Sequence, residues 1–404
     1  MNEYKNLLKN NPILLRLSMI QLIAYFGAWF SNVAIYTLLL SFNVDAKVIA
    51  FTAMLHFLAG VIQAPISGSV IDKFAPKKLM LILIFIEVIS TFMLLLINGI
   101  SDLTLLYILI FVKMAAASFY FTTEMSLLPK ILSDKNLQKA NELHSMIWSF
   151  SYTLGMALSG LFVYLLGVKF AFVVDGLMFV SAFYLLFTLK LEVESQTNKE
   201  NFFLMVGDTF SYFKRTPQAL HLMIVHAFVG LTAFDALVVL MVDSYYSSFI
   251  AVSLAIGILH ASRAVGLVVG PLFLGNWIDN KKIVYLFIAQ ALAIGLWAIL
   301  MHNFYLSIFA SVIVGFFTTT LWSYTYTLLQ KNTDESYYGR VVAYNDMFFL
   351  GSSALTSYMI GFLYSKGLSL ELVTTLIASM FVVASIYFFW ILKTQNIKDI
   401  TDAD

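Results

Sequence analysis

Long apolar runs alternate with short polar segments along almost the whole chain. Twelve of these runs reach about 20 residues or more, which is the length a helix needs to cross a bilayer core of about 30 Å. The pattern predicts twelve transmembrane helices, at about 13–40, 47–70, 78–99, 103–129, 138–166, 169–190, 218–242, 250–276, 282–301, 303–329, 341–365 and 370–392. The first run is roughly twice as long as the apolar region of a signal peptide and has no small-residue cleavage pattern after it, so we expect it to be retained.

The composition agrees with a membrane protein. Of 404 residues, 60% are apolar and 12% charged, whereas soluble domains average about 45–50% and about 25%. A net charge of +1 without a basic patch argues against nucleic-acid binding. The chain has no Cys, which excludes disulfides, thiolate metal sites and cysteine nucleophiles. It has no nucleotide-binding loop or catalytic motif, so we expect neither an enzyme nor a bound cofactor or metal.

Positive charges indicate the orientation. With the N-terminus inside, nineteen Lys and Arg residues fall in predicted inner segments and only Lys47, Lys169 and Lys366 in outer ones. This bias follows the positive-inside rule and predicts that both termini are cytoplasmic. We expect a monomer in the cytoplasmic (inner) membrane of a bacterium.

The longest polar segment, about 191–217, leaves six predicted spans on each side. Because it surrounds the apolar patch 202–206, it is typical of a linker with a short helix on the membrane surface. The sequence therefore predicts an N-terminal six-helix bundle (1–190), a cytoplasmic linker (191–217) and a C-terminal six-helix bundle (218–404).

The two halves repeat a short motif after their second span. Gly68-x-x-x-Asp72 is followed by Lys73, Lys77 and Lys78, and Gly275-x-x-x-Asp279 is followed by Lys281 and Lys282. Two repeated six-helix halves are expected to hold a substrate site near the bilayer midplane.

On these residues the sequence resembles the major facilitator superfamily, whose loop motif between the second and third helices matches Gly68, Asp72, Lys77 and Lys78. Within the superfamily it is similar to the branch of macrolide and enterobactin-type siderophore exporters. The residues that carry this similarity are Leu128-Pro129, Leu137, Ala140-Asn141, Ala171-Phe172, Asp175, Phe179, Tyr212, Pro217, Leu329-Gln330 and Gly339-Arg340-Val341. The resemblance implies an all-α membrane fold of 12 transmembrane helices in two pseudo-symmetric six-helix bundles.

Two positions depart from the family pattern. Lys113 stands where the fourth helix of the family usually has Arg, which keeps the positive charge but loses the bidentate fork. The segment 155–160 lacks the Pro that antiporters of this superfamily often show. The second departure weakens the antiport interpretation without removing it.

We assign the loop motif residues to gating of the cytoplasmic side. Their carboxylates would pair with cations or face the positive end of a neighbouring helix. The alternative is that the Lys and Arg residues only fix the topology. The gating candidates are Gly68, Asp72, Lys77, Lys78, Gly275, Asp279 and Arg340.

Charged residues inside spans are costly, at about 2.5–3.5 kcal/mol each on insertion scales, and therefore point to function. Lys113 and Glu124 lie within about 20° of one face of the fourth span. Asp235 in the seventh span and Arg263 in the eighth form a second candidate pair, for which a purely structural ion pair is the alternative. We predict that Glu124, Asp235 and Arg263 take part in proton coupling.

Other polar residues in spans have structural interpretations. We expect Glu87 and Asp175 to be structural, and His56 and His260 to be packed polar residues, because no histidine has metal-ligand spacing. For Glu124, the alternative role is an ion pair with a loop Lys near the cytoplasmic interface.

Aromatic and polar side chains recur at helical spacing on the first and tenth spans, which line the central cavity in the family fold together with the fourth and seventh. A cavity rich in aromatic groups suits a bulky, amphipathic or lipophilic substrate. The alternative is that the aromatic side chains only pack between helices. The cavity candidates are Gln21, Tyr25, Trp29, Asn32, Lys113, Tyr120, Phe317, Trp322 and Tyr326.

Three transport functions follow from these observations. The first is proton-coupled efflux of a hydrophobic or amphipathic small molecule, such as a drug or a siderophore, by alternating access. The second is a lysophospholipid transporter or flippase. The third, a metal-ion exporter, is disfavoured because Cys and clustered His are absent.

Overall fold

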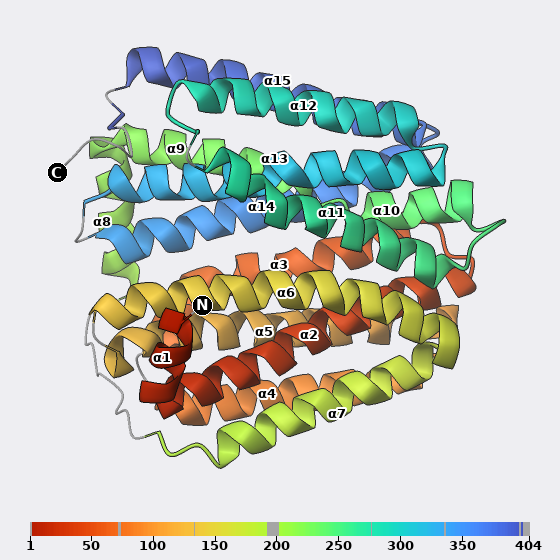
Figure 1. The fold of residues 1–404 in the computed structure, drawn as a ribbon, viewed down its shortest axis with the longest axis horizontal. Coiled ribbons are helices and arrows are strands. Elements are labelled where there is room, and N and C mark those ends of the chain that lie inside the picture. Colours follow the sequence, from red (N-terminus) through yellow and green to blue (C-terminus); the bar gives the residue numbers. More distant parts are fainter. Residues whose placement is uncertain are drawn as a thin grey trace. The chain divides into compact units, whose positions relative to one another are not determined.

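The computed structural model describes residues 2–71, 74–132, 134–191, 202–275, 277–334, 337–395 and 397–398. Across this part of the chain the secondary structure is helical and contains no strand (Figure 1). Twelve segments are long and apolar enough to cross a membrane, and each overlaps one of the predicted runs. The prediction of an all-α protein with twelve spans is confirmed.

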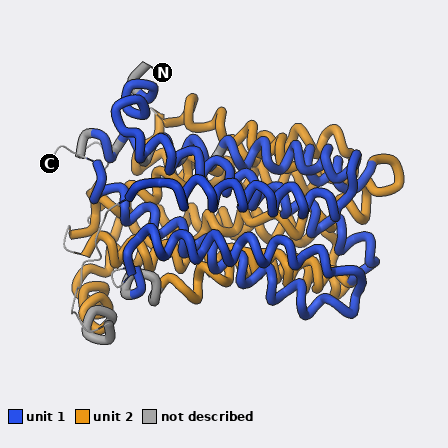
Figure 2. The backbone as a smooth tube through the Cα atoms, turned by 90° about the horizontal axis from the view of Figure 1, so that it is seen from below, with its two compact units in different colours: residues 1–44, 66–198, 251–258 blue, residues 45–65, 199–250, 259–404 orange. Residues whose placement is uncertain are grey.

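The chain forms two compact units, which are coloured separately in Figure 2. Unit 1 consists of residues 1–44, 66–198 and 251–258, and unit 2 of residues 45–65, 199–250 and 259–404. The predicted domain boundaries at residues 190 and 218 stay predictions.

Unit 1 contains six complete helices. They are α1 (Asn2–Asn10), α2 (Pro12–Ser41), α4 (Pro76–Met93), α5 (Leu103–Ile131), α6 (Asp134–Leu166) and α7 (Val168–Phe187), with the short turns η1 (Leu94–Leu96) and η2 (Ile100–Asp102). Two further helices, α3 (Ala46–Ile71) and α11 (Val252–Leu274), have residues in both units.

Unit 2 contains the remaining helices. They are α8 (Phe202–Arg215), α9 (Pro217–Val229), α10 (Asp235–Met241), α12 (Lys282–Leu300), α13 (Phe304–Lys331), α14 (Tyr338–Ser365) and α15 (Leu370–Thr394), with the short turns η3 (Gly230–Thr232) and η4 (Val242–Tyr246). The helix α8 lies inside the predicted linker and crosses the ends of α13 and α14 (Figure 1).

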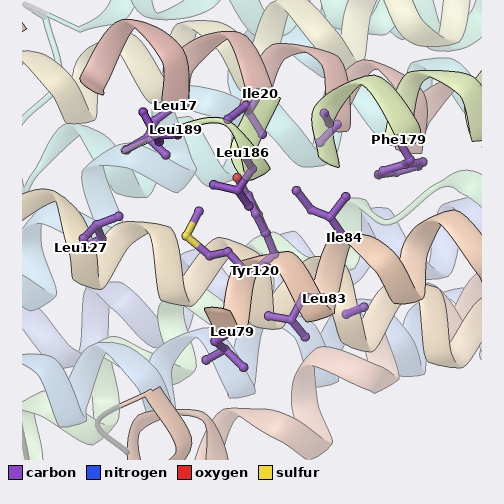
Figure 3. Packing of buried hydrophobic residues seen from close by; sticks show 14 of the residues in the cluster. Leu17, Ile20, Leu79, Leu83, Ile84, Tyr120, Leu127, Phe179, Leu186 and Leu189 are labelled. Atoms are coloured by element: carbon purple, nitrogen blue, oxygen red, sulfur yellow. The ribbon is translucent and has the colours of Figure 1, made fainter. Parts of the chain in front are cut away.

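Apolar side chains from α2, α4, α5 and α7 meet in the interior of unit 1 (Figure 3). The cluster includes Leu17, Ile20, Leu79, Leu83, Ile84, Tyr120, Leu127, Phe179, Leu186 and Leu189. The same helices also carry exposed apolar groups: on α7, Phe179 is fully buried whereas Leu177 is 56% exposed. A helix that is apolar on all sides is typical of a membrane span, because one face packs against helices and the other against lipid.

Glycines allow α11 and α13 to pack at very short distance in unit 2. A Cβ atom added at Gly270 would lie 1.8 Å from the carbonyl oxygen of Phe316, and one at Gly315 would lie 2.1 Å from that of Arg263. Backbone atoms cannot yield as a flexible side chain can. The close approach of these helices, which small residues typically permit in membranes, therefore depends on glycine.

We expect Gly270→Ala to destabilise the protein by at least about 1–3 kcal/mol, the usual cost of overpacking. The melting temperature of the purified protein in detergent measures this loss. Gly295→Ala in α12 is the matched control, because a Cβ there meets nothing within 4 Å. Equal melting temperatures for the two variants would contradict the packing described for α11 and α13.

Candidate functional site

The seventh span is broken near its middle. Helix α9 ends at Val229, η3 forms a single 3₁₀ turn, and α10 begins only at Asp235 before the π-helical turn η4. In an apolar stretch of 18 residues within this span, 72% of the residues are buried. In the corresponding stretches of the other eleven spans the buried share is 33–50%. The irregular backbone is therefore covered by protein, as it must be at membrane depth.

Arg263 of α11 binds the broken segment. Its Nη2 donates a hydrogen bond to the carbonyl oxygen of Thr232 at 2.8 Å, and its guanidinium lies 5.1 Å from the centroid of the Phe234 ring. The guanidinium thus supplies a hydrogen bond to a carbonyl group at the break. Substitutions of Arg263 would disturb the backbone itself, so this residue is a poor choice for a clean test of proton coupling.

Asp235 lies beside His260 rather than in an ion pair with Arg263. The carboxylate Oδ1 is 3.9 Å from His260 Nε2, and the side chains are 15% and 1% exposed. Within the described residues no ion pair within 4.0 Å joins Asp235 to Arg263, because the guanidinium is turned to the Thr232 carbonyl. The interpretation of His260 as a merely packed residue missed this neighbour, although its spacing of three residues from Arg263 places both on one face of α11.

A second buried charge cluster lies in unit 1. Lys113 of α5 forms an ion pair with Asp175 of α7 at 2.7 Å, and the two side chains are 5% and 0% exposed. Ser31 of α2 also donates to Asp175, and the Lys113 ammonium lies 5.0 Å from the centroid of the Phe179 ring. The structure shows Asp175 as one half of a buried ion pair, and its structural role stays a prediction. It places Lys113, a predicted cavity residue, inside the helix packing of unit 1.

Asp175 approaches α2 closely because residue 27 is glycine. A Cβ at Gly27 would lie 2.4 Å from the carboxylate Oδ1. The buried Glu87 of α4 interacts electrostatically with both Lys113 and Asp175. Lys113 therefore interacts with two buried carboxyl groups, and the structural role of both acids stays a prediction.

Glu124 belongs to a separate polar cluster. It accepts a hydrogen bond from Gln21 Nε2 at 3.4 Å, and Gln21 also contacts His144 of α6. The rings of Tyr25 and Phe121 pack against His144, with centroids 5.7 and 5.1 Å away. Lys113 and Glu124, predicted to share one face of α5, thus bind partners on different helices. No loop Lys in the described residues forms an ion pair with Glu124.

The remaining predicted cavity residues pack with aromatic neighbours of their own unit. Trp29 contacts Tyr152 and Trp148 edge to face, with centroid distances of 4.7 and 5.9 Å. Trp322 stacks on Tyr326 at 5.1 Å. The other predicted members are Asn32, which is 3% exposed, Tyr120, which is 2% exposed, and Phe317, which packs on Phe316.

Among the gating candidates of the first half, Lys77 contacts a helix end. Its Nζ donates to the carbonyl oxygen of Phe187 at 3.0 Å, and Arg16 donates to that of Thr188 at the same distance. Both cations stabilise the negative C-terminal end of α7. Lys78 is exposed. Asp72 lies outside the described residues, and of Gly68 only the helical backbone in α3 is described.

In the second half, Asp279 makes local contacts. It accepts hydrogen bonds from the backbone N–H groups of Lys281 and Lys282 at 2.9 Å and pairs with the Lys282 ammonium at 2.7 Å. The hydrogen bond from Lys282 holds the pKa of Asp279 below its usual range. Asp279 is therefore charged at physiological pH and does not suit proton uptake. Gly275 lies in the turn after α11.

Arg340, the last gating candidate, binds the linker helix. Its Nη1 donates to Asp208 of α8 at 2.8 Å, and the Tyr337 hydroxyl donates to the same carboxylate at 3.1 Å. Tyr212 stacks on Tyr337 with a centroid distance of 4.1 Å. These contacts hold α8 against the start of α14.

We expect Asp208→Asn to loosen α8, because the variant loses the ion pair with Arg340. Exposed pairs contribute about 0.2–1 kcal/mol, so tryptic cleavage at Lys214 and Arg215 should accelerate by up to about fivefold. Limited proteolysis measures the rate, with Asp243→Asn, a substitution in η4, as the control. An unchanged rate would show that the aromatic stack alone holds α8.

Comparison with known proteins agrees with this architecture. A family model described as Major Facilitator Superfamily matches residues 17–256 and 227–402. Among the curated proteins compared with the chain, none gives a significant match.

Several solved transporter structures are similar over almost the whole chain. The nucleoside transporter NupG has 14% sequence identity and a TM-score of 0.72, with 95% of this chain and 100% of that chain covered. The POT family transporter PepTSo has 11% sequence identity and a TM-score of 0.71, with 95% of this chain and 98% of that chain covered. A bacterial homologue of the human lysosomal transporter Spinster has 13% sequence identity and a TM-score of 0.73, with 95% of this chain and 96% of that chain covered. At these identities the similarity shows the fold alone. The family model covers both halves of a chain with twelve spans, and we conclude that this chain is a membrane transporter that belongs to the major facilitator superfamily.

Proposed function

We propose that the chain is a proton-coupled secondary transporter that exports a hydrophobic or amphipathic small molecule, such as a drug or a siderophore. It acts as a monomer in the bacterial inner membrane, with both termini in the cytoplasm. The observation that carries this proposal is the position of Asp235 next to His260 at the break of the seventh span.

This site suits proton exchange for electrostatic reasons. A carboxylate inside a span is costly unless it is neutralised by a proton or a nearby cation. His260 of α11 is the ionisable side chain that lies within 4.0 Å of Asp235 in the described part of the chain, and Arg263 of the same helix interacts electrostatically with His260. Arg263 itself donates to the Thr232 carbonyl, so we assign coupling to the contact between the Asp235 carboxyl and the His260 imidazole. In the proposed cycle, a movement of α11 relative to α10 changes this contact, and the change accompanies the release or uptake of a proton.

Glu124 is the second candidate for proton coupling. It is 2% exposed and accepts a hydrogen bond from the neutral amide of Gln21, and no Lys or Arg in the described residues forms an ion pair with it. We assign Glu124 a secondary role, because the backbone around it is a regular helix.

The direction of transport and the type of substrate rest on the sequence. The resemblance to macrolide and siderophore exporters supports export, and the aromatic groups around Trp29 and Trp322 suit a lipophilic substrate. Within the described residues, no group of three or more His, Asp and Glu side chains is placed to hold a metal ion. The metal-ion exporter therefore gains no support from this part of the chain.

Reconstitution in proteoliposomes tests the proposal. With an acidic lumen, the wild-type protein should accumulate erythromycin or ethidium, and a protonophore should abolish the accumulation. A fluorescent lysophosphatidylethanolamine, measured in the same vesicles, tests the alternative function of lysophospholipid transport. Movement of the lysolipid without any gradient, together with no gradient-driven uptake of the other probes, would favour the lysophospholipid transporter instead.

A further inference from the structure

Three aromatic side chains surround a buried histidine in unit 2. His226 of α9 is fully buried, and the centroids of Phe349, Tyr326 and Trp322 lie 5.3, 5.5 and 5.7 Å from its ring. Trp322 and Tyr326 come from α13 and Phe349 comes from α14. Among the three, Trp322 is the most accessible, with 39% of its surface exposed.

The hydrogen bonds of His226 determine which ring nitrogen carries the proton. The hydroxyl of Thr325 donates to the carbonyl oxygen of Leu321 at 2.8 Å, so it has only acceptor capacity for the imidazole. We therefore assign the contact between His226 Nδ1 and Thr325 Oγ1 at 2.8 Å to a hydrogen bond donated by Nδ1–H. The other nitrogen, Nε2, is left as an acceptor, and it has no hydrogen-bond partner. A buried acceptor without a donor is costly.

A carboxylate lies on the same side of α14 as Phe349. Asp346 precedes Phe349 by three residues, which places both on one helix face. Asp346 lies near enough to Tyr326 to interact with it electrostatically. In the part of the chain that the structure describes, no Lys, Arg or His side chain pairs with Asp346 within 4.0 Å. An acidic group inside a span without a cation is an expensive arrangement that a ligand would relieve.

These residues also lie at one depth. His226, Trp322 and Asp346 are each eight or nine residues from the helix end that lies near α8, counted from Pro217, Lys331 and Tyr338. At 1.5 Å per residue this is a depth of about 12–14 Å. The ring contacts of His226 and the electrostatic interaction of Asp346 with Tyr326 join these side chains at that depth. We call them the His226 cluster: His226, Trp322, Tyr326, Asp346 and Phe349.

We propose that the His226 cluster is the binding subsite for an aromatic organic cation that carries an N–H donor. The ring faces attract the cation, Asp346 balances its charge in a medium of low dielectric constant, and Nε2 of His226 accepts the N–H. The ligand enters by displacing the accessible Trp322 from its stack on Tyr326. The inference rests on the proposed function, because it names the substrate class of the same transporter.

Binding to the purified protein in detergent tests the subsite without any transport. Fluorescence anisotropy or competition measures the affinity for three probes: rhodamine 6G, an aromatic cation with N–H groups; tetraphenylphosphonium, an aromatic cation without them; and the neutral N-phenylnaphthylamine. We expect Asp346→Asn to weaken the binding of both cations by at least about tenfold and to leave the affinity for the neutral probe unchanged. His226→Phe keeps an aromatic ring at this position but removes the acceptor nitrogen. It should therefore weaken the binding of rhodamine 6G more than that of tetraphenylphosphonium.

Asp243→Asn is the matched control, because it removes a carboxylate from η4 in the same unit. The melting temperature of each variant identifies loss of folding, and the His226→Phe probe comparison remains informative if Asp346→Asn fails to fold. The proposal is overturned if Asp346→Asn binds both cations as the wild type does, or if the neutral probe binds as tightly as rhodamine 6G. Cation binding without gradient-driven transport would contradict only the proposed function. Gradient-driven transport of neutral compounds without cation binding would contradict only the subsite.

Discussion

Asp235→Asn should abolish the coupling of transport to the proton gradient while leaving the protein folded. Asparagine keeps the size of the side chain but does not exchange a proton, and the Arg263 contact with the Thr232 carbonyl does not involve the carboxylate. A coupling free energy of about 1–3 kcal/mol corresponds to about 5–150-fold, so gradient-driven accumulation should fall by about tenfold or more. Substrate exchange without a gradient should continue.

His260→Gln provides an intermediate case. The variant keeps Asp235 but replaces its titratable neighbour with a neutral amide, so the pH dependence of transport should shift while coupling persists. Asp243→Asn again serves as the control for loss of a carboxylate in the seventh span. If Asp235→Asn accumulates substrate as the wild type does, the assignment of coupling to Asp235 is wrong.

Lys113→Met should cause the largest loss of stability among the substitutions considered. It leaves the fully buried Asp175 without its cation, and breaking a buried pair in this way costs about 3–5 kcal/mol. The melting temperature in detergent should fall sharply. The double variant Lys113→Met with Asp175→Asn should recover most of the loss, because no uncompensated charge remains and Asn still accepts from Ser31. Leucine is unsuitable at position 175 because of the close approach to Gly27.

The same variants separate two roles for Lys113. If Lys113 lines the substrate cavity, as the sequence predicts, Lys113→Met should change substrate affinity at unchanged stability. If it serves the interior of unit 1, stability should fall and the double variant should transport normally. A single variant as stable as the wild type would refute the structural role.

The number of spans could be predicted from the sequence because a bilayer demands long apolar runs, and hydropathy detects them directly. The internal geometry of a span is a different matter. The seventh span was predicted as one run over 218–242, but the structure breaks it between Val229 and Asp235. The residues of the break, such as Leu231, Ala233 and Phe234, are as apolar as their helical neighbours, so hydropathy does not register the change in backbone hydrogen bonding.

For the candidate sites, too, the charged residues themselves could be predicted from the sequence, whereas their partners could not. Lys113, Glu124, Asp235 and Arg263 were identified because a charge inside an apolar run is conspicuous. Their partners were harder to predict, because pairing depends on which helices are neighbours: Lys113 and Asp175 are 62 residues apart in the chain.

Three residues of the His226 cluster, His226, Asp346 and Phe349, are not among the candidates that the sequence pattern indicates. Asp346 lies within the predicted eleventh span, and its carboxylate in an apolar run is a signal of the same kind as that of Asp235. His226 gives no such signal, because a neutral histidine in an apolar run shows its missing hydrogen-bond partner only in three dimensions.

The most direct test of proton coupling at Asp235 is to measure the lumenal pH of proteoliposomes, with a pH-sensitive dye inside them, during transport. A transported probe is added outside without any imposed gradient, and its entry and the dye signal are recorded together. For the wild type we predict that the lumenal pH rises as the probe enters, because a proton leaves in exchange, and that Asp235→Asn shows no such rise. Entry of the probe into wild-type vesicles without a change in pH, or an equal rise in the variant, would contradict proton coupling at Asp235.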